Sequence, residues 1–277
     1  MSESNVAQFS VNVYDTVFIS DLHLGAQGCQ AEALLEFLQS TPCNNLIMVG
    51  DIIDGWQLKS RIYWPDSHIN VVREILRKSR TGTNVVYVTG NHDEFLRNYS
   101  GIELGNIQLV DEYHFKAKTG EDYLVIHGDQ FDVVTLYARW IAGIGDIGYN
   151  LLLKLNTSLN KVRARLGYGY WSLAKWAKDS VKQAVSFIGD FEVAVAQECE
   201  RRGFDGVICG HIHKAVEKKI GDVTYYNCGD WVESCTAILH KQNGEFEIVN
   251  YFDHKLAQPE IMPEPLHDQD HDRKNAA

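Results

Sequence analysis

The chain has 277 residues, of which 45% are hydrophobic and 23% are charged, a composition typical of a globular protein with one large domain. Its net charge of −11 argues against nonspecific nucleic-acid binding, which needs clustered lysine and arginine to displace counterions. No uninterrupted apolar run of about 18 residues occurs, so a transmembrane helix is not expected, and the polar residues 1–15 do not resemble a signal peptide.

Five short apolar runs recur along the chain, and each ends in polar residues. These runs are Val17–Ile19, Leu46–Val49, Val85–Val88, Leu124–Ile126 and Val207–Cys209. Apolar runs of this length are typical of strands buried on both faces. Helix-like segments at 31–39 and 69–78 separate the first three runs, and this alternation predicts an α/β fold with a largely parallel sheet. Ligands of such sheets bind beyond the carboxyl ends of the strands.

The rest of the chain divides into three parts. Aromatic and aliphatic residues recur at helical spacing from 132 to 202, which predicts a helical insertion, or cap. Three antiparallel strands are expected at 223–226, 235–240 and 245–251, with turns at residues 221–222 and 243–244. Residues 258–277 contain three of the five prolines and are expected to be disordered. Residues 1–131 and 203–257 would then form one domain around the insertion.

Polar motifs with metal-binding side chains follow all five runs. They read Asp21-x-His23, Gly50-Asp51-x-x-Asp54, Gly90-Asn91-His92-Asp93, His127-Gly128-Asp129 and Gly210-His211-x-His213. Each motif alone is a weak signal, because an aspartate at a strand end is usually a turn former. Together they supply the roughly eight ligand positions that two close divalent cations need. Nitrogen and oxygen ligands without thiolate favour Mn, Fe or Zn over calcium, and Mn is the expected metal.

The five motifs resemble those of the calcineurin-like metallophosphoesterases. This resemblance implies a double β-sandwich flanked by helices and a dinuclear metal centre. It places Asp21, His23, Asp51 and His213 on one metal, and Asp51, Asn91, His127 and His211 on the other. His92 would face the substrate phosphate and stabilise the transition state or protonate the leaving oxygen, with Asp93 orienting its ring. Asp54 and Asp129 are expected to support the ligands from behind.

Basic and aromatic residues concentrate in the insertion. Residues 150–189 contain seven basic side chains and one acidic one, a balance of +6 within a protein of net charge −11. This mixture suits an anionic amphiphile or an anionic lipid surface, although a helical hairpin with a solvated basic face would look the same. The residues expected to bind the substrate there are Lys175, Lys178, Lys182, Trp171 and Trp176.

The overall layout resembles a narrower group, the UDP-2,3-diacylglucosamine diphosphatases of lipid A synthesis and their paralogues. That resemblance implies hydrolysis of a lipid-linked nucleotide pyrophosphate to UMP and a lipid sugar phosphate. One position departs from the group, which usually has arginine after the asparagine of the third motif, whereas this chain has His92.

Two alternatives stand beside this hypothesis. The chain could be a phosphodiesterase or phosphomonoesterase for a soluble substrate, or a metal-binding scaffold without catalysis. The scaffold predicts lost ligands or a lost His92, and all of them are present. The scattered cysteines, without a C-x-x-C pair, favour reduced thiols in the cytosol. A cytoplasmic enzyme with peripheral contact to the inner face of the membrane is therefore expected, and nucleic acid is not an expected partner.

Overall fold

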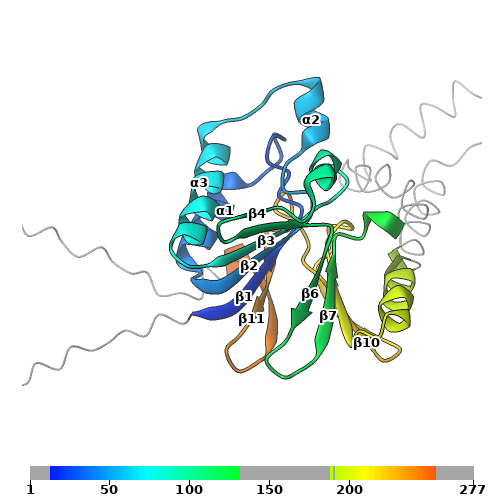
Figure 1. Ribbon diagram of the computed structural model, residues 1–277. Coiled ribbons are helices and arrows are strands. Elements are labelled where there is room, and N and C mark those ends of the chain that lie inside the picture. The colour runs from blue at the N-terminus through cyan, green and yellow to red at the C-terminus, as the bar shows by residue number, and fades with distance from the viewer. Residues whose placement is uncertain (1–12, 132–187, 190, 254–277) are drawn as a thin grey trace, which may run out of the picture.

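The computed structural model describes residues 13–131, 188–189 and 191–253. Within them, two β-sheets pack face to face and carry helices on their outer faces (Figure 1). The chain is α/β with two β-sheets flanked by helices, as expected from the sequence. None of the helices in the described ranges is long and apolar enough to cross a membrane.

The first sheet has seven strands in the order β12-β11-β1-β2-β3-β5-β4. The strands β1, β2, β3 and β5 are parallel, and β4, β11 and β12 are antiparallel to their neighbours. The bounds are β1 Tyr14–Ile19, β2 Cys43–Val49, β3 Asn84–Val88, β4 Glu103–Leu104, β5 Ile107–Val110, β11 Thr236–His240 and β12 Phe246–Asn250.

The second sheet has five strands in the order β6-β7-β8-β10-β9. Its inner strands β7, β8 and β10 run parallel, and its two edge strands are antiparallel to them. The expected strand at 223–226 is therefore paired on both sides, parallel to β8 and antiparallel to β9. The bounds are β6 Glu112–Lys116, β7 Asp122–Ile126, β8 Gly206–Cys209, β9 Val216–Ile220 and β10 Val223–Asn227.

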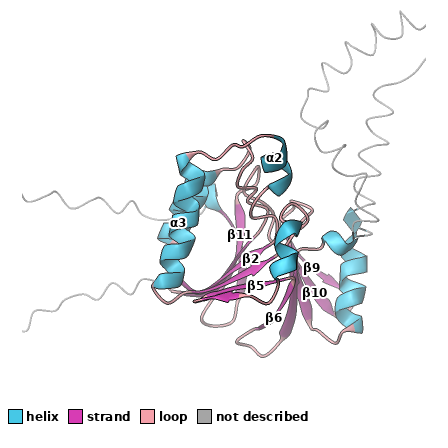
Figure 2. Cartoon of the chain, turned by 45° about the horizontal axis from the view of Figure 1, so that its top comes forward, coloured by secondary structure: helices cyan, strands magenta, loops and turns pink. Residues whose placement is uncertain are grey.

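Helices cover both outer faces of the sandwich (Figure 2). The helices α1 and α3 pack on the first sheet, and the helix at 191–201 packs on the second. The short helix α2 and two 3₁₀ helices, η1 and η2, stand in loops that follow the strands. The bounds are α1 Ala31–Ser40, α2 Gly55–Ser60, α3 Asp66–Arg80, η1 Glu94–Tyr99 and η2 Asp129–Phe131.

Three apolar layers hold these elements together. Strand β1 contributes to two of these layers, because alternate side chains of a strand point to opposite faces of the sheet. Phe18 lies between the two sheets, whereas Val17 and Ile19 pack under α1 and α3. On the far side of the second sheet, Phe191 and Val195 of the 191–201 helix close the third layer. The described end of the expected insertion thus packs directly on the second sheet.

The six cysteines are all buried and free. They pack in the apolar layers; Cys209 of β8 and Cys199 of the 191–201 helix, for example, both belong to the third layer. They therefore serve as core residues of the sandwich.

Candidate metal centre

All seven expected metal ligands gather where five parallel strands end. Three of these strands belong to the first sheet and two to the second, so the site spans the junction of the sheets. The ligands follow β1 (Asp21, His23), β2 (Asp51), β3 (Asn91), β7 (His127) and β8 (His211, His213).

One group of ligand atoms surrounds Asp21. Its Oδ1 lies 3.1 Å from His213 Nε2 and 3.8 Å from His23 Nε2. These three side chains each place one ligand atom within 4.8 Å of the others, a spacing that can hold a single cation. Two imidazole nitrogens and a carboxylate oxygen suit a first-row transition metal.

A second group surrounds His127, whose Nε2 lies 3.2 Å from Asn91 Oδ1 and 3.3 Å from His211 Nδ1. The same Nε2 is 3.4 Å from Asp51 Oδ2. On its other side, Asp51 Oδ2 is 3.9 Å from His23 Nε2 of the first group. Asp51 therefore stands between the two groups, where a carboxylate can bridge two cations.

Two buried atoms show that the residues fit a metal. Asp21 Oδ1 and His23 Nε2 are shielded from solvent, yet neither makes a hydrogen bond of good geometry within the described part of the chain, even though Asp21 Oδ1 lies 3.1 Å from His213 Nε2. A buried polar atom without a partner costs about 1–3 kcal/mol, so such atoms are expected to have a ligand. Both atoms point into the first group, and a cation there would satisfy them.

Two glycines leave space for the carboxylates. A Cβ added at Gly90 would collide with Asp51 Oδ1, and one added at Gly210 would stand 2.5 Å from Asp21 Oδ2. The same glycines precede Asn91 and His211 in their motifs. Glycine is thus required at these positions by the close approach of a ligand from another strand.

The backbone of the ligand loops is strained. Six described residues other than glycine have a positive φ, and five of them are expected ligands. Left-handed backbone costs a residue with a side chain on the order of 1–3 kcal/mol and is concentrated at functional sites. The five ligands are Asp21 (52°), His23 (50°), Asp51 (55°), His211 (72°) and His213 (52°).

The charges of the site are mutually stabilising. Burial alone would raise the pKa of Asp21 and of Asp51, but the surrounding histidines hold both values well below the usual range. Burial alone would lower the pKa of His127, and the carboxylates of Asp51 and Asp21 outweigh it and raise that pKa. The carboxylates are therefore ionised at neutral pH and available to a cation.

Asp54 supports two rings from behind. Its Oδ2 lies 3.3 Å from His23 Nδ1, and its Oδ1 lies 2.9 Å from His92 Nδ1. Each ring therefore directs its Nε2 toward Asp51 Oδ2, at 3.9 Å in both cases. A carboxylate behind a metal-binding histidine helps to orient the ring, as Asp54 does for His23 through a hydrogen bond.

The expectation that Asp93 orients His92 is wrong. Asp93 turns away and accepts hydrogen bonds from Ile52 N (2.9 Å), Gly90 N (2.5 Å) and the Tyr87 hydroxyl (2.7 Å). Burial raises its pKa, and Asp51 adds to this effect. Asp93 thus ties the loops after β2 and β3 together, while Asp54, from the preceding motif, contacts the His92 ring.

The structure adds residues that the motifs did not reveal. Trp56 packs on His92, with ring centroids 4.1 Å apart, and Arg97 of η1 forms an ion pair of 2.6 Å with Asp129. Asp230 Oδ2 lies 3.9 Å behind His213 Nδ1. A signal for Asp230 was present, because Gly229-Asp230 follows β10 as Gly50-Asp51 follows β2. The other residues carry no local signature.

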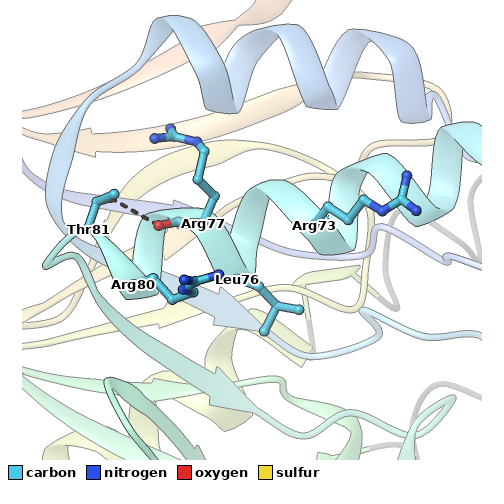
Figure 3. Close-up of a pocket in the computed structure, with 5 residues that line it drawn as sticks. All are labelled: Arg73, Leu76, Arg77, Arg80 and Thr81. Atoms are coloured by element: carbon cyan, nitrogen blue, oxygen red, sulfur yellow. Dashed lines mark hydrogen bonds between the residues drawn. The ribbon is translucent and has the colours of Figure 1, made fainter.

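The expected substrate-binding residues of the insertion lie outside the described residues. These are Lys175, Lys178, Lys182, Trp171 and Trp176, and the expected tail at 258–277 also lies outside. Among the described residues, a surface hollow is lined by Arg73, Leu76, Arg77, Arg80 and Thr81 (Figure 3). It stands at the end of α3 that leads into β3, whereas the ligand Asn91 follows the opposite end of that strand. The hollow is therefore separate from the metal centre.

This fold and site define a metal-dependent phosphoesterase, a hydrolase. The family model for calcineurin-like phosphoesterases matches residues 14–215, which include every motif described above. The chain belongs to the calcineurin-like phosphoesterase family.

Relatives cover most of the chain. A UDP-2,3-diacylglucosamine hydrolase of Neisseria meningitidis serogroup A is 32% identical over 228 residues, which span 80% of this chain and 92% of that protein. The protein of the same name from Haemophilus ducreyi is 24% identical over 237 residues, or 84% and 98%. Among solved structures, an archaeal phosphodiesterase (14% identical, TM-score 0.38) and Yfce, a phosphoesterase from E. coli (13%, 0.40), each align with 85% of this chain and 98% of their own. At these scores the structural likeness does not inform on function.

Proposed function

We propose that this phosphoesterase hydrolyses the pyrophosphate bond of UDP-2,3-diacylglucosamine or of a close analogue, giving UMP and a lipid-linked sugar phosphate. The observation that carries the proposal is the name shared by relatives that align with 80–84% of the chain. Those alignments are longer than the segment that contains the five motifs. The proposal also accounts for the +6 balance of residues 150–189, since a pyrophosphate substrate is anionic.

We infer that Asp21, His23, Asp51 and His213 hold one divalent cation, and that the second is held by Asp51 together with Asn91, His127 and His211. Mn is the proposed metal, with Fe or Zn as alternatives, because the donors are nitrogen and oxygen. When bound, the cations supply positive charge for the phosphate oxygens and lower the pKa of water.

The residues of this chain supply the rest of the chemistry. Cleavage of the P–O bond leaves a negative charge on the departing oxygen, and we infer that His92 donates the proton that neutralises it. Its Nδ1 faces Asp54, and its Nε2 faces the metal centre, 3.9 Å from Asp51 Oδ2. Asp93 acts indirectly, since it holds the loop that carries Asn91 and His92.

A soluble phosphodiester is the second candidate substrate. The specific observation in its favour is His92, which stands where the lipid-processing group usually carries arginine. An arginine binds phosphate with a fixed positive charge, whereas a histidine can also give up a proton. That difference is compatible with a substrate whose leaving oxygen needs protonation.

The proposed determinants of substrate choice are Lys175, Lys178, Lys182, Trp171 and Trp176. Lysines spaced three and four residues apart share one face if the segment is helical, and they would converge on phosphate or on a headgroup. The tryptophans would contact the acyl chains and bring the protein into peripheral contact with the membrane.

The test compares two substrates with two proteins. Wild type and the triple Lys175→Glu, Lys178→Glu, Lys182→Glu variant are loaded with Mn and assayed on UDP-2,3-diacylglucosamine and on an aryl phosphodiester at fixed ionic strength. We expect kcat/KM of wild type to be far higher on the lipid. The reversal should lower that value by about ten-fold or more and leave the aryl substrate within about two-fold, as expected for lost substrate contacts. Similar effects on both substrates would contradict a lipid substrate and favour the soluble phosphodiester.

A further inference from the structure

His92 is enclosed by side chains from two other motifs. The indole of Trp56 lies over its ring at a centroid distance of 4.1 Å and an angle of 33°. The ring of His23 meets it edge-on at 4.6 Å and 88°, and Asp54 lies behind it. His92 is 4% exposed as a result, although Trp56 itself is 40% exposed.

The backbone of His92 is also tied to the loop that carries Trp56. His92 N donates to Asp51 Oδ1 at 2.7 Å, and Gly55 N donates to His92 O at 3.0 Å. Gly55 is needed for this approach, because an added Cβ would stand 2.8 Å from that carbonyl oxygen. The first residues of α2 therefore bring Trp56 to the His92 ring.

These ties fix the backbone of His92 but leave its ring to be fixed by packing. The last torsion of a histidine has broad minima, so one polar contact does not define the ring plane. Asp54 Oδ1 is 2.9 Å from His92 Nδ1, but Nδ1 makes no hydrogen bond of good geometry with a described residue. The indole face limits rotation of the ring on the side open to solvent.

We propose that Trp56 is a positioning residue that holds the His92 ring with Nε2 directed at the metal centre. This inference rests on the proposed role of His92 in proton donation. Trp56 needs no contact with the reacting atoms in this role.

The experiment uses the metal-loaded protein, four variants of Trp56 and His92, and one control variant. Trp56→Leu removes the aromatic face, Trp56→Phe retains a smaller one, and both are compared with His92→Ala and with the double variant Trp56→Leu/His92→Ala. Phe252→Leu replaces another exposed aromatic residue, which lies after β12, and serves as the control. The substrate is an alkyl phosphodiester, whose poor leaving group needs a proton donor.

We expect His92→Ala to retain both metals and to lower kcat by about a hundred-fold, the loss typical of a removed general acid. Trp56→Leu should lower kcat by about ten-fold with little change in KM, because a small misplacement of a reacting group is costly. Trp56→Phe should lose less. In the His92→Ala background, Trp56→Leu should have almost no further effect.

A second readout does not depend on turnover. In Zn-loaded protein with labelled histidine, the Cε1 proton of His92 should be shifted upfield by the indole and should move downfield in Trp56→Leu. An unchanged resonance, or equal losses of kcat with and without His92, would overturn the positioning role. A rise of KM alone would make Trp56 a substrate contact instead. Full turnover of His92→Ala would refute the role of His92 itself, a result visible before any Trp56 variant is made.

Discussion

Gly90 shows how a residue without a side chain controls the ligands. It lies beside Asp51 and His127, two ligands from other strands, and any Cβ would push into both. Its φ is not in the left-handed region, so steric space alone demands glycine here. A substitution at Gly90 should therefore weaken metal binding before it destabilises the fold.

We predict that Gly90→Ala loses at least one bound metal and most of its activity, because Asp51 must move away from its bridging position. Metal content is measured by mass spectrometry after gel filtration, and the fold by circular dichroism. Gly189→Ala is the control, since its added Cβ meets no atom of the described residues within 4 Å. Two metals and wild-type turnover in Gly90→Ala would show that the Asp51 loop can adjust.

The proposed ligands, and Asp54 as a residue behind them, were predictable from the sequence, but the side chain that contacts the His92 ring was not. Each proposed ligand lies in a short motif directly after a buried strand. Its place at the sheet edge is therefore determined by residues near it in the sequence. The residue that contacts the His92 ring depends on how the loops after β2 and β3 approach each other. The sequence suggested Asp93, the next residue, whereas the structure has Asp54 there. The sequence around Trp56 does not predict its contact with His92 either, because His92 lies in a motif from another part of the chain.

At the scale of elements, the buried strands were predictable, and so was the edge strand β12, expected at 245–251; the other edge strands, β4, β6 and β9, were not. The five apolar runs correspond to β1, β2, β3, β7 and β8, whose residues are nearly all buried. Strand β9, at the edge of the second sheet, has three consecutive charged residues between Val216 and Ile220, and β4 is two exposed residues long. Edge strands need no continuous apolar run, and charged residues there prevent unwanted pairing. The six-residue α2 is too short for helical periodicity.

The pairing of β1 with β11 contains a buried titratable pair. His240 is fully buried, and its Nδ1 lies 3.1 Å from Asp15 Oδ2. Burial lowers the pKa of His240, and this effect outweighs the carboxylate of Asp15, which raises it. A histidine with a lowered pKa binds fewer protons in the folded state than in the unfolded state. Stability is therefore lost as the pH falls from the unfolded value, about 6.5, through the folded one.

We predict that the difference in unfolding free energy between wild type and His240→Gln shrinks as the pH falls from 8 to 5. Glutamine is uncharged over this range, and the slope cannot exceed about 1.4 kcal/mol per pH unit for one proton. Urea unfolding of both proteins in the same chelating buffer removes the contribution of the metal ligands. A difference that is constant with pH would mean that His240 titrates normally in the fold.

At the scale of the whole molecule, the metal centre joins the two sheets. Four ligands follow strands of the first sheet, and three follow strands of the second. The apolar layer between the sheets is formed by side chains such as Phe18 and Tyr226. Cations at the upper edge of this layer would hold the two halves together, in addition to any role in hydrolysis.

We predict that chelation lowers the melting temperature of the metal-loaded protein by about 5 °C or more. A ligand at 100 times its Kd adds about 2.7 kcal/mol to the folded state, and 1 kcal/mol shifts Tm by about 2–4 °C for a chain of this size. Scanning calorimetry with and without EDTA measures the shift. Asp51→Ala should show a much smaller one, and an equal shift in that variant would trace the effect to another site.

The order of the ligands along the chain has a consequence for biosynthesis. His211 N donates to Asp21 Oδ2 across 190 residues of sequence, and both residues belong to the centre. A nascent chain emerging from the ribosome displays Asp21 and His23 long before the last motif exists. The two-cation site therefore cannot be completed during most of translation. Completion of the proposed site has to wait until residues 211–213 have left the ribosome.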